Sequence, residues 1–426
     1  MRRHILNSLK EWKNSKTRKP LILQGARQVG KTWILKKFGM QEYDKTVYLN
    51  FENSERLRTI FSIDFDIARI ISTIEIEVGF KINSDNCLII FDEIQEADRG
   101  TTALKYFFEN HPEYHIIAAG SLLGISIQNS SFPVGKVDFL KMYPMSFIEF
   151  LEALDKDLLV EQLNSKNWSV VDTFHEQLIE LLRIYYFIGG MPEVIANYTL
   201  NKDLSEVRNI QIKILQGYEN DFTKYAPINE VQRIRLVWQH LISQLSKENK
   251  KFIYGQVKKG SRAKDFESAI YWLVNAGLVI KVDMVHKPTI PLNAYADFDI
   301  FKLYCVDIGL INALAMLDSK IILEKNNILT EFKGALTEQF VAQQLFMVHK
   351  LYYWSSTNAT SEVDFLIQKE NVIIPIEVKA EENLKAKSLR VFVEKYQSQL
   401  ALRLSMNKKR KQDWLTNLPL YAVNTI

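Results

Sequence analysis

The chain has 426 residues, of which 47% are hydrophobic and 24% are charged. This is an ordinary composition for folded globular domains, and it excludes extensive disorder. At this length we expect two to four domains. Lysine and arginine number 54 against 50 aspartates and glutamates, a mildly basic balance that permits nucleic-acid contact without requiring it.

The cysteine usage and the amino terminus favour a cytoplasmic protein. Cys87 and Cys305 are the only cysteines and lie far apart in apolar segments, so we expect neither a disulfide framework nor a cysteine metal site. The amino terminus carries charge but no following apolar stretch, and no segment approaches the roughly 18 apolar residues that span a bilayer. We therefore expect a cytoplasmic location and no membrane contact.

Residues 1–150 are predicted to form an α/β core with a parallel sheet. Short apolar runs alternate there with amphipathic segments, a pattern typical of buried strands covered by helices on both faces. The runs occupy residues 21–23, 47–51, 88–91 and 116–119.

The remainder of the chain is predicted to form three further domains. Residues 151–222 lose the strand signal and show apolar residues at helical spacing, which indicates a helical lid. Residues 223–290 run as helix, basic turn, helix, glycine stop and strand, the order of a winged helix-turn-helix. Residues 291–426 contain a strand, a long helix from about 327 to 349 and a hairpin over 362–378, and are predicted to form a second α/β domain.

The segment after the first apolar run carries the first chemical signal. It reads Gly25-Ala26-Arg27-Gln28-Val29-Gly30-Lys31-Thr32. An apolar strand precedes it and a helix follows, which is the context that a phosphate-binding loop requires. The glycines let the backbone wrap the phosphates, Lys31 reaches the β- and γ-phosphate oxygens, and Thr32 is placed for Mg²⁺. We expect all eight residues to contribute to an ATP site, with Lys31 also catalytic.

The apolar run at 88–91 ends in two carboxylates, at the edge of the sheet where ligands of open α/β folds lie. Asp92 is expected to hold Mg²⁺. Glu93 is either the catalytic base that orients or deprotonates the attacking water, or a cap for the next helix. The run at 116–119 leads to Ser121, which is either a γ-phosphate sensor or part of an ordinary turn.

These motifs resemble those of bacterial and archaeal AAA-type P-loop ATPases that carry a carboxyl-terminal domain of unknown function. The resemblance rests on the phosphate loop, on Asp-Glu-Ile-Gln at 92–95, on Gly-Ser at 120–121, on Tyr-Pro-Met-Ser-Phe-x-Glu-Phe at 143–150 and on Gly-Gly-Met-Pro at 189–192. It covers nearly the whole chain. It implies an ATPase core over residues 1–150, a lid whose Gly-Gly-x-Pro turn approaches the nucleotide, and an accessory domain.

One departure concerns an arginine acting on a neighbouring site. Where the family often has Gly-Arg, this chain has Gly135-Lys136, and lysine cannot form the same planar bidentate contact. Arg99 could serve instead, or it could be a solvated arginine at a helix start. The identity of an arginine finger therefore stays open, as does oligomerisation.

The predicted carboxyl-terminal hairpin carries alternating charges on both strands. With a turn centred on 370–371, antiparallel pairing places Asp364 opposite Glu377, where both carboxylates could hold one divalent cation, Mg²⁺ or Mn²⁺. Lys379 would contact a phosphate or activate water, and Glu338 on the upstream helix would add a further ligand.

This set of Glu, Asp and Glu-x-Lys on adjacent strands resembles the PD-(D/E)xK nuclease superfamily, particularly its Holliday-junction-resolvase-like branch. The resemblance implies a nuclease-like domain over residues 291–426. Two alternatives stay open: a solvated sheet face on which Glu362, Lys379 and their neighbours pair across strands, or a fold of this kind that binds without cleaving.

Two basic groups indicate DNA as a candidate partner. One surrounds the turn of the predicted winged helix and the other lies near the end of the chain; they are Lys258, Lys259, Arg262 and Lys264, and Lys408-Lys409-Arg410-Lys411. Each is also explained as a solvated surface, and winged helices often bind proteins. The sequence thus supports either a DNA-directed ATPase with a nuclease-like module or a nucleotide-dependent switch or scaffold that binds protein or nucleic acid without cleavage.

Overall fold

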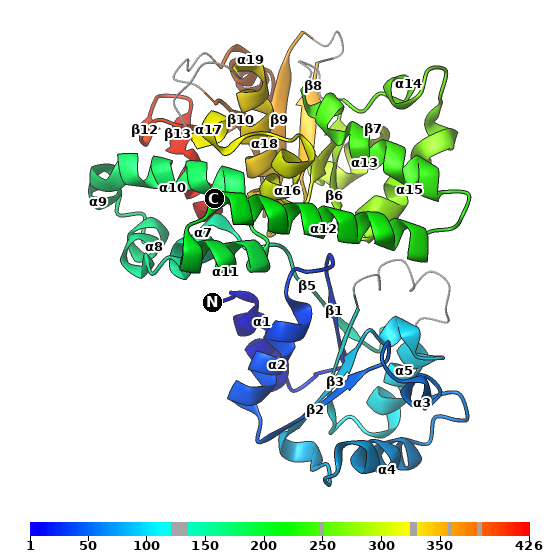
Figure 1. The fold of residues 1–426 in the computed structure, drawn as a ribbon. Helices are drawn as coiled ribbons and strands as arrows, with labels where there is room; N and C mark the ends of the chain where they lie inside the picture. Colours follow the sequence, from blue (N-terminus) through cyan, green and yellow to red (C-terminus); the bar gives the residue numbers. More distant parts are fainter. Residues whose placement is uncertain (121–134, 247–250, 324–329, 357–359, 381–385) are drawn as a thin grey trace. The chain divides into compact units, whose positions relative to one another are not determined.

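The computed structural model describes residues 1–120, 135–246, 251–323, 330–356, 360–380 and 386–426. Contacts divide the chain into two compact units: residues 2–143 with 275–277 form one, and residue 1 with 144–274 and 278–426 forms the other. Each unit is built on a sheet of its own (Figure 1). No helix in the described ranges has the length and apolar character of a bilayer span.

The first unit, residues 2–143, contains a five-stranded sheet of order β2-β3-β4-β1-β5 in which all neighbours are parallel. Its strands are β1 (Leu21–Gln24), β2 (Lys45–Asn50), β3 (Cys87–Asp92), β4 (His115–Ala119) and β5 (Asp138–Lys141). The first four confirm the apolar runs of the sequence. Strand β5 was not predicted, because its residues alternate between half-buried and exposed and form no apolar run.

Helices cover both faces of this sheet (Figure 1). They are α1 (Ile5–Asn14), α2 (Lys31–Glu42), α3 (Glu55–Arg58), α4 (Ile67–Val78) and α5 (Gly100–Asn110), with 3₁₀ turns η1 (Ser84–Asn86) and η2 (Ile94–Glu96). Helix α4 begins where the Asp66 carboxylate accepts hydrogen bonds from two backbone amides, and it ends at Gly79 in the left-handed conformation. Its apolar face packs with α5 on β2, β3 and β4 in one buried cluster. Burial of this cluster fixes the carboxyl ends of the strands, where the polar residues lie.

The second unit, residues 144–426, begins with helices. They are α7 (Phe147–Ala153), α8 (Asp157–Asn164), α9 (Trp168–Val171), η4 (Asp172–Phe174), α10 (His175–Ile188), α11 (Pro192–Asn201) and α12 (Leu204–Tyr225). They confirm the helical character predicted for residues 151–222. At the start of α7, Ser146 and Glu149 form a reciprocal capping box.

The sheet of this unit has eight strands in the order β12-β13-β11-β10-β9-β8-β6-β7. The strands are β6 (Val279–Val285), β7 (Ala296–Cys305), β8 (Tyr352–Ser355), β9 (Glu362–Lys369), β10 (Val372–Val378), β11 (Leu402–Ser405), β12 (Arg410–Lys411) and β13 (Thr416–Pro419). The remaining helices are α13 (Val231–Leu245), α14 (Tyr254–Val257), α15 (Ala263–Asn275), α16 (Ile308–Leu314), α17 (Ser319–Leu323), α18 (Thr330–Phe346) and α19 (Lys387–Tyr396), with 3₁₀ turns η5 (Leu292–Tyr295) and η7 (Leu420–Thr425). The long helix and the hairpin read from the sequence are both present.

Helices α13 to α15 and strands β6 and β7 follow one another in the order read as a winged helix. Strand β6 pairs antiparallel with β7 on one side and parallel with β8 on the other. The two strands are therefore part of the eight-stranded sheet. The division of the chain at residues 150, 222 and 290 stays a prediction.

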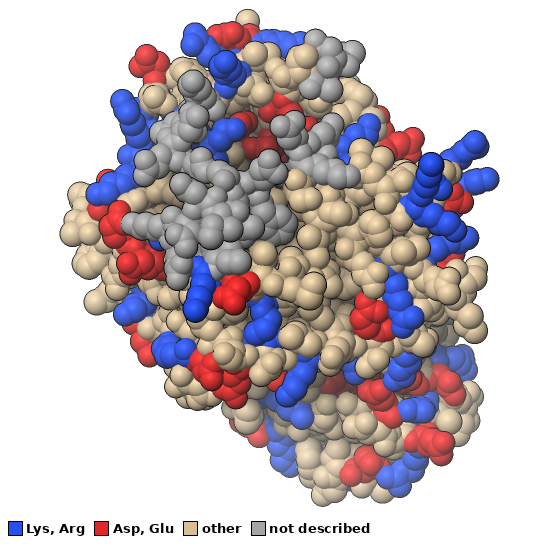
Figure 2. Space-filling model, turned by 45° about the horizontal axis from the view of Figure 1, so that its top comes forward, with Lys and Arg blue, Asp and Glu red and all other residues tan. Residues whose placement is uncertain are grey.

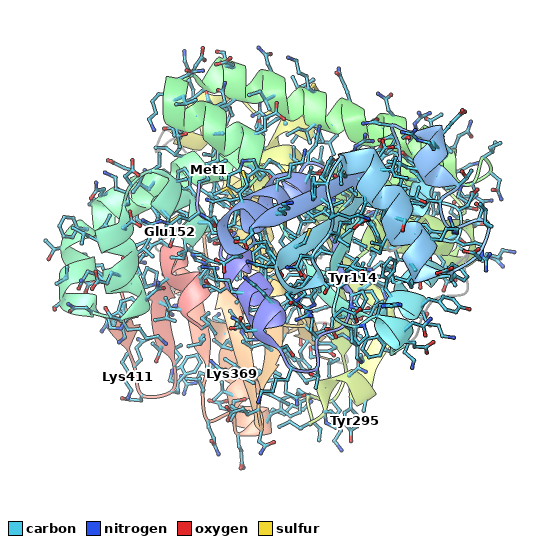
Figure 3. The ribbon with its side chains drawn as sticks, turned by 90° about the horizontal axis from the view of Figure 1, so that it is seen from below. Met1, Tyr114, Glu152, Tyr295, Lys369 and Lys411 are labelled. Carbon is cyan, nitrogen blue, oxygen red and sulfur yellow. The ribbon has the colours of Figure 1, made fainter. Side chains whose placement is uncertain are left out.

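The basic run near the end of the chain lies at an edge of this sheet. Arg410 and Lys411 form the exposed edge strand β12, and Lys411 is labelled in Figure 3. Charged side chains on an edge strand hinder pairing with another chain. The run thus has a structural explanation, and its contact with DNA stays a prediction.

The Gly-Gly turn at 189–190 is held by hydrogen bonds within the second unit. The Asp307 carboxylate accepts hydrogen bonds from the amides of Gly190 (2.6 Å) and Leu310 (3.0 Å), while the Met145 amide donates to the Gly190 carbonyl (2.6 Å). Burial raises the pKa of Asp307 to about 6. The amide and the carbonyl of Gly190 are therefore hydrogen-bonded within the second unit. The approach of this turn to a nucleotide stays a prediction.

Replacing Gly189 with alanine is expected to destabilise the second unit by at least about 2 kcal/mol. Gly189 has φ 72° and ψ −164°, and a Cβ there would lie 2.2 Å from Oδ1 of Asp307. Urea denaturation measures the effect. Gly334→Ala is the matched control, because Gly334 lies in α18 with open space around it, and it should change stability by no more than about 1 kcal/mol. Equal stability of the two variants would contradict the account.

Candidate functional site: the nucleotide loop and a carboxylate cluster

The phosphate loop joins β1 to α2 in the first unit. Gly30 caps α2 in the left-handed conformation (φ 93°), and Gln28 also has positive φ (65°). A Cβ at Gly25 would lie 2.2 Å from the carbonyl oxygen of Met142. The backbone path of the loop therefore explains why both positions are glycine. The same path presents backbone amides at the amino terminus of α2.

Lys31 is the first residue of α2 and is 7% exposed. Its ammonium donates to the carbonyl oxygens of Gly25 and Ala26, both at 2.9 Å. These two bonds hold the lysine over its own loop. Carbonyl oxygens carry only partial charge, so phosphate oxygens are stronger partners for the same ammonium.

Asp92, at the end of β3, is the centre of a small hydrogen-bond network. It is 2% exposed, and its Oδ2 accepts from the hydroxyls of Thr32 (2.7 Å) and Tyr48 (2.8 Å). Thr32 follows β1, and β4 lies between β1 and β3 in the sheet. The network thus gathers the loop and the acidic strand end at one edge of the sheet.

Tyr48 is a site residue that sequence reasoning missed. Burial, assisted by Asp92, raises its pKa to about 12, so the phenol stays protonated and acts as a donor at neutral pH. The Lys36 ammonium lies 3.7 Å from the ring centroid. Only the parallel pairing of β2 with β3, which aligns Asn50 with Asp92, brings this tyrosine to the carboxylate, and no motif signals it.

Glu93 follows Asp92 in the left-handed conformation, with φ 51°. Its side chain makes no capping hydrogen bond to η2, and its role as catalytic base stays a prediction. Its Oε2 accepts from Nε2 of Gln95 at 2.6 Å. Gln95 therefore orients the carboxylate of Glu93.

Arg3 is a second residue that the sequence did not reveal. It is 6% exposed, and its guanidinium donates to the carbonyl oxygens of Val29 (2.9 Å) and Tyr143 (2.7 Å). It ties the phosphate loop to the end of the first unit. The Arg2-Arg3 pair near the chain start offers no pattern from which this role could be predicted.

The remaining candidates of this unit are placed as follows. Ser121 lies outside the described residues. Lys136 pairs with Glu109 at 3.0 Å. The Arg99 guanidinium lies 4.1 Å from the ring centroid of Phe65. Both cations thus have partners within their own unit.

In the second unit, the hairpin has the predicted register. The ladder runs from Val372 opposite Lys369 to Ile376 opposite Phe365, and its continuation by one pair sets Glu377 opposite Asp364. The Asp364 Oδ2 accepts from the amide of Val378 at 2.7 Å. The two carboxylates expected to face each other therefore stand on neighbouring strands in register.

Glu377 is 5% exposed. Its Oε1 accepts from the Lys379 ammonium at 2.6 Å, and its Oε2 is buried without a partner. Burial raises the pKa of Glu377, against the opposing effect of Lys379. Although burial lowers the pKa of Lys379, the Glu377 carboxylate raises it above its ordinary value. A partnerless buried carboxylate oxygen is costly, so a hydrogen-bond donor or a positive charge at this oxygen would lower the free energy of the folded unit.

Further charged groups surround this pair. Tyr304 donates to the Glu338 carboxylate at 3.4 Å, and Lys302 of β7 forms an ion pair with Glu362. We refer to Lys302, Glu338, Glu362, Asp364, Glu377 and Lys379 as the carboxylate cluster. Lys302, Glu338 and Glu377 are each less than 8% exposed. Glu362, Asp364 and Lys379 are half-buried, and Glu362 pairs with Lys302 across strands.

As the side chains stand, no three His, Cys, Asp or Glu residues in the described part of the chain are grouped so that they could hold a metal ion. In the cluster, Lys379 takes one oxygen of Glu377 and a backbone amide takes one oxygen of Asp364. A cation at this place would have to compete with the Lys379 ammonium for Glu377.

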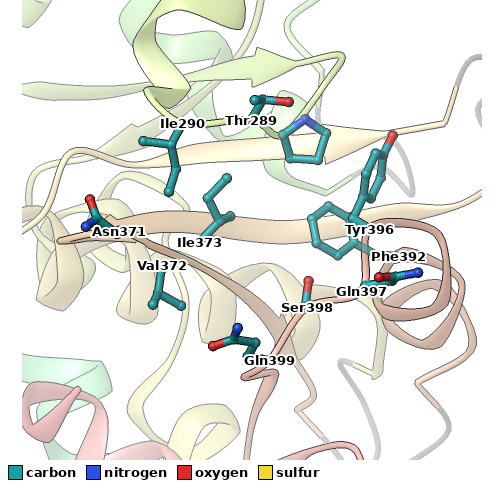
Figure 4. Close-up of a pocket in the computed structure, with 11 residues that line it drawn as sticks. Thr289, Ile290, Asn371, Val372, Ile373, Phe392, Tyr396, Gln397, Ser398 and Gln399 are labelled. Carbon is teal, nitrogen blue, oxygen red and sulfur yellow. The ribbon is translucent and has the colours of Figure 1, made fainter.

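A separate pocket of about 390 Å³ opens on the second unit. Figure 4 shows it between the loop at 288–290, the hairpin turn at 371–373 and the end of α19 with residues 397–399. Its polar lining consists of amides and hydroxyls, and no charged side chain lines it. The lining offers hydrogen-bond donors and acceptors but no carboxylate, imidazole, ammonium or guanidinium group.

Lysine, arginine, aspartate and glutamate are interspersed on the face shown in Figure 2. Nucleic acids bind most strongly where cations gather in one stripe or patch. This face therefore gives no further support for the DNA contacts predicted from the sequence.

Comparisons with known proteins agree with the reading of the first unit. Residues 17–151 match a family model described as an AAA domain. Residues 179–321 and 333–423 match two models described as domains of unknown function. No curated protein matches the chain. Residues 17–151 are thus similar to AAA domains, and the matched families leave the function of the rest undefined.

Three solved structures resemble the chain. A Walker-type ATPase of Pyrococcus abyssi is 14% identical, with 74% of this chain and 95% of that chain covered and a TM-score of 0.46. The Aeropyrum pernix ORC1 protein in complex with DNA is 12% identical, with 74% and 93% covered and a TM-score of 0.30. Drosophila ORC bound to DNA is 12% identical, with 76% and 95% covered and a TM-score of 0.27.

Tyr48→Phe is expected to raise the Mg²⁺ concentration needed for half-maximal binding of a fluorescent ATP analogue by about fivefold, since one hydrogen bond to an ionised group contributes roughly 1 kcal/mol or more. Binding without Mg²⁺ should be unchanged. Tyr43→Phe is the matched control, because the Tyr43 hydroxyl bonds His115 rather than Asp92. An unaltered Mg²⁺ requirement in Tyr48→Phe would remove the tyrosine from the site.

Proposed function

We propose that the protein binds ATP with Mg²⁺ and hydrolyses it. The observation that carries the proposal is the hydrogen bond between Thr32 and Asp92, 2.7 Å long, with the Lys31 ammonium held over the same loop. A hydroxyl, a carboxylate and an ammonium at the start of one helix are the groups that hold a magnesium triphosphate. The match of residues 17–151 to the AAA domain supports the same reading.

In this proposal the amides of the loop and the amino terminus of α2 receive the phosphates, and the Lys31 ammonium leaves the Gly25 and Ala26 carbonyls for the β- and γ-phosphate oxygens. Thr32 and Asp92 would hold Mg²⁺, which neutralises charge on the phosphates when bound. Arg27, Gln28 and Val29 contribute backbone to the loop. Ser121 remains the candidate sensor of the γ-phosphate.

Glu93 is proposed as the general base. Its carboxylate lies one residue beyond Asp92, and Gln95 holds one of its oxygens at 2.6 Å. The other oxygen is then oriented to accept a proton from the attacking water, or to align that water. Gln95 acts as a positioning residue through Glu93.

Lys31→Ala is expected to lower affinity for ATP at least about tenfold and to abolish hydrolysis, because it removes the cation that faces the β- and γ-phosphates. Glu93→Gln should keep ATP binding and lower the hydrolysis rate by about 100-fold or more. Phosphate release and calorimetric titration separate the two effects. Glu96→Gln, three residues further on, serves as the control and should retain the wild-type rate. Unchanged hydrolysis in Lys31→Ala, with folding retained, would refute the proposal.

A second function is proposed for the carboxylate cluster because of the buried, partnerless Oε2 of Glu377. Glu338, Asp364 and Glu377 would hold one divalent cation, Mg²⁺ or Mn²⁺, which polarises a phosphodiester when bound. Lys379 would contact the phosphate or activate water. We infer a nuclease-like module with DNA as substrate. The alternative is a switch or scaffold whose carboxyl-terminal region binds protein or nucleic acid without cleavage.

Cleavage is tested on supercoiled, branched and single-stranded DNA with Mg²⁺ or Mn²⁺. Asp364→Ala and Lys379→Ala are each expected to lower the rate by about 100-fold or more, since one removes a cation ligand and the other the catalytic lysine. Asp413→Ala is a control for an exposed carboxylate of the same unit. Equal background activity in all proteins would reject cleavage and leave the binding module.

We also propose the following domain organisation. Residues 151–222 would form the lid, 223–290 the winged-helix-like domain and 291–426 the nuclease-like domain. The basic turn after α14, in the winged-helix-like domain, would contact DNA or a protein. A cytoplasmic location and the oligomeric state stay expectations.

A further inference from the structure

A buried arginine contacts the backbone of the phosphate loop in the first unit. Arg3 is 6% exposed, and one nitrogen of its guanidinium donates to the carbonyl oxygen of Val29 at 2.9 Å. Val29 is itself buried and stands immediately before Gly30 in the loop. The positive charge of Arg3 is therefore held against the peptide group that joins Val29 to Gly30.

This contact sets the direction of one backbone amide of the loop. The carbonyl of Val29 and the N–H of Gly30 belong to one planar trans peptide group, so they point in opposite directions. Because Arg3 binds the carbonyl, the Gly30 N–H points away from Arg3. Within the described residues this N–H donates no hydrogen bond. A ligand on the side of the loop opposite Arg3 would meet it.

The peptide group on the other side of Gly30 is held by α2. The Gly30 carbonyl accepts a hydrogen bond from the amide of Ile34 at 3.0 Å. Gly30 itself has φ 93°, which glycine adopts without strain. Arg3 and the first turn of α2 therefore hold the two peptide groups that flank Gly30.

The guanidinium of Arg3 is also anchored to the segment that follows β5. A second nitrogen donates to the carbonyl oxygen of Tyr143 at 2.7 Å. The preceding residue, Met142, donates its amide to the carbonyl oxygen of Gln24, at the end of β1, at 2.7 Å. Because a guanidinium is planar and its donors have a fixed geometry, the position of this segment determines where the Val29 carbonyl is held.

We propose that Arg3 is a positioning residue of the phosphate loop and orients the Gly30 amide toward the phosphates of the bound nucleotide. A carbonyl that accepts from a guanidinium also makes the N–H of its own peptide group a stronger donor. Arg3 acts through Gly30 and needs no contact with the nucleotide. The inference rests on the proposed nucleotide site and adds a residue that lies outside its sequence motif.

Binding of ADP with Mg²⁺ to the full-length chain, measured by calorimetric titration, tests the proposal. Arg3→Gln should raise the dissociation constant about tenfold, because the hydrogen bond from Gly30 to a charged phosphate is weakened. Arg2→Gln is the matched control, since Arg2 is the exposed neighbour of Arg3, and it should bind as the wild type does.

The Gly30 amide gives a second readout, which a merely structural role of Arg3 would not move. Labelling valine carbonyls with ¹³C and glycine amides with ¹⁵N selects the amides that follow a valine, those of Gly30, Gly79 and Gly135. On addition of ADP with Mg²⁺, the Gly30 amide proton should move downfield in the wild type and by less in Arg3→Gln. The amide of Gly79, at the end of α4, is the internal control and should not move.

The outcomes separate this inference from the function on which it rests. If the wild type binds no nucleotide, both are overturned. If Arg3→Gln binds ADP as tightly as Arg2→Gln, the role of Arg3 is overturned and the nucleotide site remains. If Arg3→Gln does not fold, the wild-type spectrum decides: a downfield shift of the Gly30 proton supports the inference, and an unmoved Gly30 proton in the ADP complex overturns it.

Discussion

The first unit depends on one carboxylate oxygen, the Oδ2 of Asp92, which accepts hydrogen bonds from Thr32 and Tyr48. The three residues belong to β3, to the start of α2 and to β2, so the contact requires that the whole parallel sheet be formed. Because Asp92 is 2% exposed, these donors replace the water that its buried carboxylate has lost. The same order of strands puts the Lys31 ammonium over the phosphate loop. Fold and candidate nucleotide site are thus fixed by the same packing.

The second unit places charge inside a sheet in a different way. In the carboxylate cluster the compensating groups are lysines, and the Glu377 oxygen without a partner is the point of imbalance. Buried ion pairs often contribute little net stability, yet removing one partner is strongly destabilising. We therefore propose that the cluster serves binding rather than stability. The ion of the proposed function would lie at the Glu377 oxygen that has no partner.

Local sequence patterns were sufficient to predict many of the elements and site residues of both units. Strands β1 to β4, the phosphate loop before α2 and the hairpin register of Asp364 and Glu377 all follow from apolar runs, glycine spacing and alternation. Contacts between distant residues were not predictable. Tyr48 reaches Asp92 through strand pairing, and Arg3 reaches Tyr143 at the other end of the unit. Lys302 lies 60 positions before Glu362, and its strand reads as an ordinary part of the core.

The central claim is that the loop and Asp92 form one magnesium triphosphate site, and a crystal structure of the full chain with Mg²⁺ and a non-hydrolysable ATP analogue tests it most directly. The account predicts that the Lys31 ammonium leaves the carbonyls of Gly25 and Ala26, now 2.9 Å away, and contacts the β- and γ-phosphates, with Mg²⁺ between Thr32 and Asp92. A nucleotide bound elsewhere, with Lys31 still on its carbonyls, would contradict it.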